Sequence, residues 1–195
     1  MKHLVFFASG SGTNFQSVID AIQDGEIDAR INGLITNNPT AKALKRAEQN
    51  GIPTRIVPPS SFDDQKKYTD TLLKILAAWE PHLIVLAGYM LKIPVAVLQA
   101  YPKRIINIHP SLLPKFGGQG YYGMKVHEAV LQAGESKTGC SVHIVTQAYD
   151  EGPVLAQRTV PVKPSDDAET LANRVLGQEH ELLPSAIKKY LSTLN

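Results

Sequence analysis

Asn107 and His109 are the side chains whose types and spacing best suit chemistry at a carbonyl carbon. They lie in the stretch RIINIHP, residues 104–110. On an extended chain, side chains two residues apart point to the same side. An amide N–H and an imidazolium N–H are the donors needed by an oxygen that becomes negative when an amine adds to a carbonyl. His109 can also move the proton that the attacking amine loses.

A carboxylate in a separate turn, Asp150, is the predicted partner of His109. The turn, residues 146–153, follows the apolar segment SVHIV. If it folds over the active-site face, Asp150 can hydrogen-bond His109 and favour the charged form of the ring. The alternative is an Asp that only stabilises its own turn. The neighbouring Glu151 is expected to face solvent.

A run of small residues, Ser9–Asn14, is predicted to bind a phosphate group. It lies between the apolar segment LVFFA and the helical segment FQSVIDAI. Backbone N–H groups at such a turn and the partial positive charge of a helix N-terminus attract phosphate. The loop differs from a dinucleotide-binding fingerprint, because Phe15 replaces the third glycine and no acidic residue follows Thr36. The alternative is a tight turn in which Asn14 caps the helix.

Elements that position these loops alternate along the chain. Short apolar runs predict strands at Leu4–Ala8, Ile31–Thr36, Thr54–Val57, Leu83–Ala87, Ile105–Ile108, Ser141–Val145 and Val154–Val160. Segments with helical periodicity predict helices at Phe15–Gln23, Ala41–Gln49, Asp64–Trp79, Val95–Tyr101, Val126–Gln132 and Ala168–Leu191. This alternation indicates one α/β domain over residues 1–195, with a doubly wound, mainly parallel sheet covered on both faces.

In such a sheet, ligands bind at the carboxyl ends of the strands. The loops Ser9–Asn14, Asn107–Pro114 and Tyr149–Gly152 are predicted to occupy such ends. His143, on a strand with alternating polarity, is a predicted wall of the same pocket. A satisfied interior histidine is the alternative.

Composition excludes several classes of protein. The 195 residues have a formal charge of +2, and the basic residues form no block that would follow a nucleic-acid backbone. The most apolar region, residues 83–98, is interrupted by Gly88, Lys92 and Pro94, so no membrane span is expected. Cys140 is the single cysteine, which suits a cytoplasmic protein. The six histidines lack the spacing of a zinc site, and no metal is expected.

The chain resembles the folate-dependent phosphoribosylglycinamide formyltransferases of purine biosynthesis over almost its whole length. The matching motifs, in chain order, are SGSGTNFQ, LAGYM, NIHPSLLPKF, SVHIV, YDEGPV and QEHELLP. The resemblance implies a Rossmann-like formyltransferase fold with three layers, αβα. It also implies 10-formyltetrahydrofolate as co-substrate and glycinamide ribonucleotide as substrate, in a monomer or homodimer.

The resemblance also assigns residues. It implies a catalytic trio of Asn107, His109 and Asp150. It implies substrate binding by Gly12, Thr13, Asn14 and Glu179, the last holding the amine end. It implies folate contacts from Gln65, Met90, Leu91, Lys92, Ile93 and Asn107.

Three segments depart from the family pattern. Leu91 followed by Lys92 stands where an Arg is common after the Met of the folate segment. Gln65 stands at a second position where many family members carry an Arg, and Lys66 or Lys67 are possible substitutes for that Arg. Residues 117–123 form a longer, glycine-rich loop, for which a mobile lid is a hypothesis.

The predicted reaction is direct attack of the substrate amine on the formyl carbon, without a covalent enzyme intermediate. Methionyl-tRNA formyltransferase resembles the catalytic core but adds a C-terminal nucleic-acid-binding domain, which is not expected here. Formyltetrahydrofolate hydrolase usually has an extra N-terminal domain. A further alternative is a non-catalytic sensor domain that only binds nucleotide. Such a domain would not need His109 and Asp150, and both are present.

Overall fold

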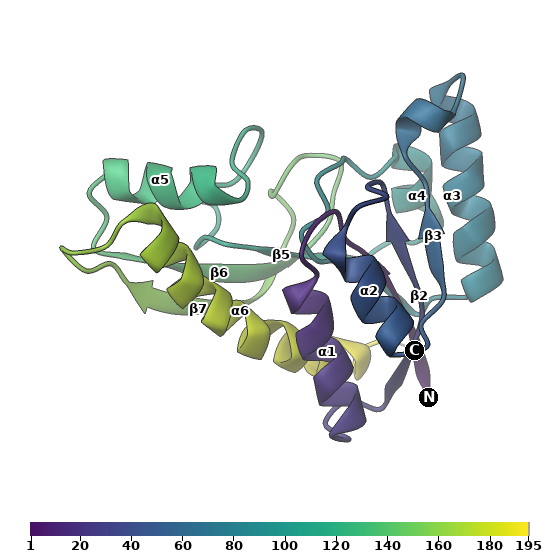
Figure 1. Cartoon of the computed structure of the whole chain (residues 1–195), viewed down its shortest axis with the longest axis horizontal. Helices are drawn as coiled ribbons and strands as arrows, with labels where there is room; N and C mark the ends of the chain where they lie inside the picture. The colour runs from purple at the N-terminus through teal and green to yellow at the C-terminus, as the bar shows by residue number, and fades with distance from the viewer. Residues whose placement is uncertain (195) are drawn as a thin grey trace.

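The computed structural model describes residues 1–194, and all the predicted strands and helices are present in it (Figure 1). The strands are β1 Lys2–Phe7, β2 Ala29–Thr36, β3 Thr54–Ile56, β4 Leu83–Leu86, β5 Ile105–His109, β6 Lys137–Ile144 and β7 Val154–Pro161. The α-helices are α1 Thr13–Gln23, α2 Lys42–Gln49, α3 Gln65–Trp79, α4 Val95–Ala100, α5 Met124–Gln132 and α6 Ala168–Leu191. A short 3-10 helix, η1, spans Pro59–Ser61 and was not predicted.

Helix starts follow from local capping. The Asp64 side chain accepts a hydrogen bond from Lys67 N at 2.7 Å, so α3 begins directly after it. Asp167 starts α6 in the same way, through Thr170 N at 2.8 Å. Helix α1 begins two residues earlier than predicted because Gly12, with a left-handed φ of 69°, is its N-cap. Asn14 therefore lies inside the helix and does not cap it.

The strands form one mixed sheet in the order β3-β2-β1-β4-β5-β6-β7. Neighbouring strands from β3 to β5 are parallel, whereas β5 pairs with β6 and β6 with β7 in antiparallel fashion. The prediction of a mainly parallel sheet is confirmed.

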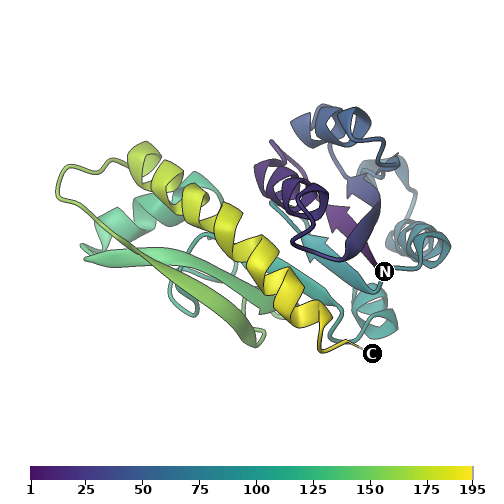
Figure 2. The ribbon, with the colours of Figure 1, turned by 90° about the horizontal axis from the view of Figure 1, so that it is seen from below.

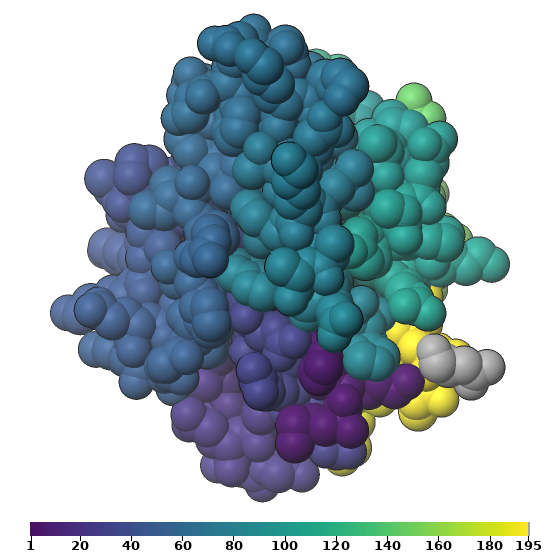
Figure 3. All heavy atoms as spheres, turned by 90° about the vertical axis from the view of Figure 1, so that its right-hand side faces the viewer, coloured from purple at the N-terminus to yellow at the C-terminus, as the bar shows by residue number. Residues whose placement is uncertain are grey.

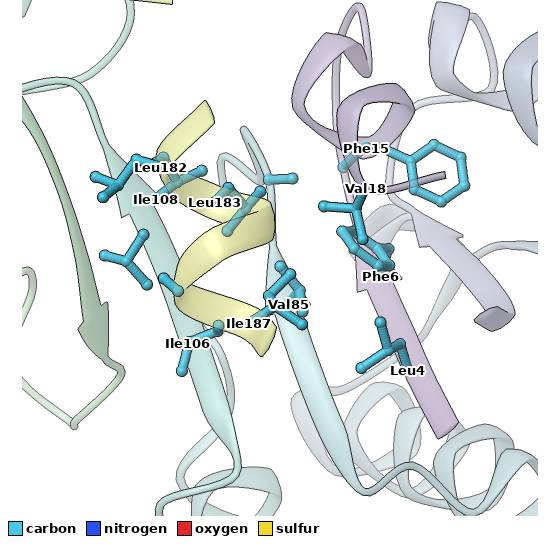
Figure 4. Packing of buried hydrophobic residues seen from close by; sticks show 14 of the residues in the cluster. Leu4, Phe6, Phe15, Val18, Val85, Ile106, Ile108, Leu182, Leu183 and Ile187 are labelled. Carbon is cyan, nitrogen blue, oxygen red and sulfur yellow. The ribbon is translucent and has the colours of Figure 1, made fainter. Parts of the chain in front are cut away.

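Helices cover both faces of the sheet, which confirms the three layers (Figures 1 and 2). On one face Leu4 and Phe6 of β1 pack in a core cluster with residues of α1, α2, α5 and α6. Figure 4 shows α6 placing Leu183 and Ile187 over the central strands of this face. The alternate residues of the same strand, Val5 and Phe7, pack on the other face with α3 and α4.

The face formed by α3 and α4 is seen in Figure 3, where residues coloured blue to teal cover most of the surface. The first and last described segments meet beside this face (Figures 2 and 3). There Lys2 Nζ donates a hydrogen bond to the Leu194 carbonyl at 2.6 Å. No helix within residues 1–194 has the length and apolar character needed to cross a membrane.

The direction of β6 corrects one prediction about the site. Because β6 runs antiparallel to β5, its carboxyl end at Ile144 lies beside Ile106, near the start of β5. The loop that follows β6 therefore does not leave the sheet at the edge where β1 and β5 end. It must turn back along the sheet to bring Asp150 to His109. The apolar pattern of a strand identifies the strand but not its direction, so the sequence did not reveal this.

Candidate active site

Asn107 and His109 project from β5 into one cavity of about 450 Å³. Their neighbours Ile106 and Ile108 point to the opposite face and pack in the core with α6 (Figure 4). The alternation follows from the pleat of the strand, as the spacing predicted. His109 is 4% exposed, so its ring is largely shielded from water.

Asp150 lies beside His109, as the sequence predicted for a turn folded over this face. Its Oδ2 is 3.6 Å from His109 Nδ1, which is an ion-pair distance but longer than a normal hydrogen bond. The same oxygen accepts a hydrogen bond from Gly118 N at 3.0 Å. Asp150 has a left-handed φ of 56°, which is uncommon for a residue with a side chain. Glu151 is exposed, as expected.

The charge state of His109 differs from the prediction. Burial lowers the pKa of His109 below the usual histidine value, while the Asp150 carboxylate and the Phe116 carbonyl act in the opposite direction. Burial alone would raise the pKa of Asp150, but contacts with His143, His109 and Gly118 N–H together hold that pKa below its usual value. We therefore assign a neutral ring beside an ionised carboxylate at neutral pH. The Asp150 carboxylate favours the charged form of the ring, as predicted, but burial has the larger effect on the pKa of His109, and the sequence prediction did not include it.

His143 contacts both Asn107 and Asp150. It opposes Asn107 across the β5–β6 pairing and is 2% exposed. Its Nδ1 lies 3.0 Å from the Ile144 carbonyl, which only accepts, so Nδ1 bears a proton. Its Nε2 lies 3.1 Å from Asn107 Nδ2, within hydrogen-bond distance. Asp150 Oδ1 lies 3.4 Å from the same nitrogen. His143 is thus a pocket wall, as predicted, and also orients the Asn107 amide.

The segment after β5, Phe116 and the glycine-rich loop that follows it, contacts the site through its backbone. His109 Nε2 donates to the Phe116 carbonyl at 2.8 Å. A Cβ on Gly117 would lie 2.5 Å from Leu113 Cδ2 and 3.1 Å from Asp150 Cβ, so any larger residue at this position would require both side chains to shift. Backbone groups have no sequence signature of their own, and sequence reasoning missed both this carbonyl and the N–H of Gly118.

The predicted phosphate loop occupies the junction of β1 and α1. No side chain caps α1, and its first turn contains no acidic residue. Asn14 Nδ2 donates to Glu179 Oε2 at 2.6 Å, which joins two predicted substrate-binding residues from α1 and α6. Asn14 Oδ1 is buried and has no hydrogen-bond partner within residues 1–194. Burial raises the pKa of Glu179, and the Asn14 amide opposes the rise.

Replacing Gly12 with alanine should destabilise the protein. The left-handed backbone costs a residue with a Cβ about 1–2 kcal/mol. The new Cβ would also lie 2.7 Å from Ala43 Cβ, and such crowding costs about 1–3 kcal/mol more. Gly25→Ala is the matched control, because Gly25 has φ +76° but nothing within 4 Å of its added Cβ. Urea unfolding should show a larger loss of stability for Gly12→Ala; equal losses would contradict the crowding.

Most of the predicted folate-contact residues line the cavity. The lining includes Met90, Leu91, Lys92, Ile93 and Asn107, together with His109, His143 and Asp150. The loop of the predicted phosphate site joins this segment through Ser9, whose Oγ accepts from Met90 N at 3.0 Å. The phosphate-loop residues and Glu179 are not part of the cavity wall.

Gln65 is not brought to the cavity. It is the exposed first residue of α3 and is absent from the cavity wall. The possible substitutes Lys66 and Lys67 form exposed ion pairs, Lys66 with Asp70 of the same helix and Lys67 with Asp63 just before it. Within residues 1–194, no three His, Cys, Asp or Glu side chains lie close enough together to hold a metal ion.

A mainly parallel sheet between two helical layers, with polar side chains at the carboxyl end of β5, defines a doubly wound α/β protein with a ligand site. The family model for formyl transferase matches residues 2–187. The chain therefore belongs to the formyl transferase family.

Individual relatives agree with this assignment. The chain is 42% identical over 187 residues to the chloroplastic phosphoribosylglycinamide formyltransferase of Vigna unguiculata, covering 96% of this chain and 60% of that protein. It is 37% identical to the phosphoribosylglycinamide formyltransferase of Bacillus subtilis, covering 100% of this chain and 97% of the relative. The crystal structure of glycinamide ribonucleotide transformylase 1 from Symbiobacterium toebii superposes with a TM-score of 0.93 at 36% identity, covering 99% of this chain and 89% of that one.

Proposed function

We propose that this protein transfers the formyl group of 10-formyltetrahydrofolate to the amine of glycinamide ribonucleotide. The main support is the convergence of Asn107, His109 and Asp150 on one cavity, from β5 and from the loop after β6. The names of the relatives agree with this reaction. In this proposal the three residues act together on the formyl group.

The substrate amine and its phosphate would bind on the α1 side. Gly12, Thr13 and Asn14 begin a helix whose first N–H groups have no side-chain cap, which favours an anion such as phosphate. Glu179 would hold the amine end, because its carboxyl oxygens accept hydrogen bonds and one of them already accepts from Asn14 at the start of α1.

The formyl donor would occupy the cavity. Its volume of about 450 Å³ lies within the usual range for sites that bind drug-sized molecules. Met90, Leu91, Lys92 and Ile93 form one wall of this cavity. Asn107 Nδ2 has two N–H groups, and only one is used by His143, so the other can meet the formyl oxygen.

The reaction would proceed by direct attack. The amine nitrogen bonds to the formyl carbon, and the carbonyl oxygen becomes an oxyanion that accepts from Asn107. Neutral His109 takes the proton released by the amine and becomes an imidazolium beside Asp150. It then gives that proton to the folate nitrogen as the carbon–nitrogen bond breaks. The products are the formamide and tetrahydrofolate.

Replacing Asp150 with asparagine should lower both the pKa of His109 and the rate. The carboxylate raises the pKa of His109 in the protein, whereas burial lowers it. Without the carboxylate, the effect of burial is larger and the pKa falls further. The imidazolium formed during the reaction also loses its partner, and we expect turnover at pH 7 to fall about tenfold or more. NMR titration of the His109 ring and steady-state rates measure the two effects. An unchanged or higher His109 pKa would contradict this role.

The activity itself can be tested by absorbance difference spectroscopy of the folate. The protein is incubated with 10-formyltetrahydrofolate, with and without glycinamide ribonucleotide. The proposal predicts that the donor is consumed only when the amine is present. Consumption without the amine would indicate a hydrolase, and binding without consumption would indicate a sensor.

A further inference from the structure

The loop that precedes α1 packs against α2 and hydrogen-bonds to it. The Gly10 carbonyl accepts a hydrogen bond from Ala43 N at 3.1 Å. A Cβ added to Gly12 would lie 2.9 Å from Ala43 Cα and 3.4 Å from Arg46 Cδ, so the loop backbone rests directly on the helix. The orientation of the loop therefore depends on residues of α2.

Arg46 makes the second contact of this kind. Its Nε donates to the Ser11 carbonyl at 2.9 Å, and its Nη1 donates to Gln16 Oε1 at 3.4 Å. Arg46 is half-buried and forms no ion pair within the part of the chain that the structure describes. Its guanidinium therefore links the loop to α1 while its positive charge remains uncompensated.

The two carbonyl contacts determine where the loop N–H groups point. In a planar trans peptide, the C=O and the following N–H point in opposite directions. With the Gly10 and Ser11 carbonyls turned toward α2, the N–H groups of Ser11 and Gly12 point away from it. Neither of these donors has a backbone acceptor in the contacts around the loop. They face the side where the proposed phosphate would bind.

We propose that Arg46 is a positioning residue for the phosphate of the substrate: it holds the Ser11 carbonyl so that the Gly12 N–H faces the anion, and it adds a positive charge behind the loop. This inference rests on the proposed function of the loop. It adds α2, which makes no part of the predicted site, to the residues that determine phosphate affinity.

Titration with inorganic phosphate tests the inference without requiring formyl transfer. In the full chain, amide signals of residues 11–14 should shift with phosphate in the NMR spectrum. Arg46→Gln should weaken this binding about tenfold, which is the lower end for a hydrogen bond to a charged group. Arg30→Gln removes the same charge from an exposed site on β2 and should leave the affinity unchanged. No phosphate-dependent shift in the wild type, or equal affinities of wild type and Arg46→Gln, would overturn the inference.

Kinetics separate positioning from a general structural role. The wild-type protein is first shown to formylate both glycinamide ribonucleotide and its dephosphorylated riboside. Arg46→Gln should then lower kcat/KM about tenfold for the phosphorylated amine and leave kcat/KM for the riboside unchanged. Arg46→Lys keeps the charge and one donor, and should lose less than Arg46→Gln on the phosphorylated substrate. Should Arg46→Gln not fold, the loss of kcat/KM in Arg46→Lys is compared between the two amines instead. Equal losses on both amines would overturn the inference, whereas a wild type that formylates neither amine but still binds phosphate would refute only the proposed function.

Discussion

Replacing His109 with alanine should lower kcat by about 10²–10⁴-fold, the usual contribution of a positioned acid–base group. The proposed mechanism has this ring accept the proton of the attacking amine and return it to the leaving nitrogen. Its 4% exposure and its neutral form in the free protein suit a base. Substrate binding involves other groups, so KM for both substrates should change little.

The matched control for this variant is His82→Ala. His82 accepts a hydrogen bond from His3 N at 3.0 Å and lies at the amino edge of the sheet, away from the cavity. Its loss should leave kcat within about twofold, as is usual for groups remote from the reacting atoms. If folded His109→Ala retained more than about a tenth of the wild-type kcat, its role as acid and base would be refuted.

The second large effect is expected from Asn107→Ala. Removal of one oxyanion donor typically lowers kcat by about 10²–10³-fold. His143 fixes the Asn107 amide through the 3.1 Å contact, so the donor is oriented before the substrate arrives. Steady-state kinetics with both substrates saturating measure the effect.

A double variant tests whether the two residues act as a unit. If Asn107 and His109 stabilise the same transition state, the combined loss in Asn107→Ala/His109→Ala should be smaller than the product of the single losses. Asn32→Ala is the control for Asn107, because Asn32 binds the Trp79 carbonyl at 2.8 Å, remote from the cavity. Fully multiplicative losses would indicate two independent roles.

The positions of strands and helices could be predicted because they depend on local apolar periodicity. The segment from Leu4 to Ala8, for example, is apolar at every position, which predicts a strand covered on both faces. In the structure Leu4 and Val5 accordingly pack in different core clusters. The direction of β6 could not be predicted in this way, because an apolar strand has the same pattern in both directions. Its antiparallel course depends on pairing with β5, which is a tertiary contact.

The site was predictable where it depends on spacing within one strand. Asn107 and His109 share a face because they are two residues apart. The link between His143 and Asn107 requires the β5–β6 register, which local sequence does not specify. The charge of His109 depends on burial, which is also a property of the folded chain. Gln65 was assigned by resemblance alone, and its position at the exposed start of α3 does not support a contact with the cavity.

Transfer of a doubly labelled formyl group tests the proposed reaction most directly. The donor carries ¹³C and ¹⁸O in its formyl group, and the products formed in unlabelled water are analysed by mass spectrometry. Direct attack predicts that both labels appear together in the formamide of glycinamide ribonucleotide, because the carbonyl oxygen never leaves the carbon. Labelled free formate, or a formamide that has lost its ¹⁸O to water, would contradict the account.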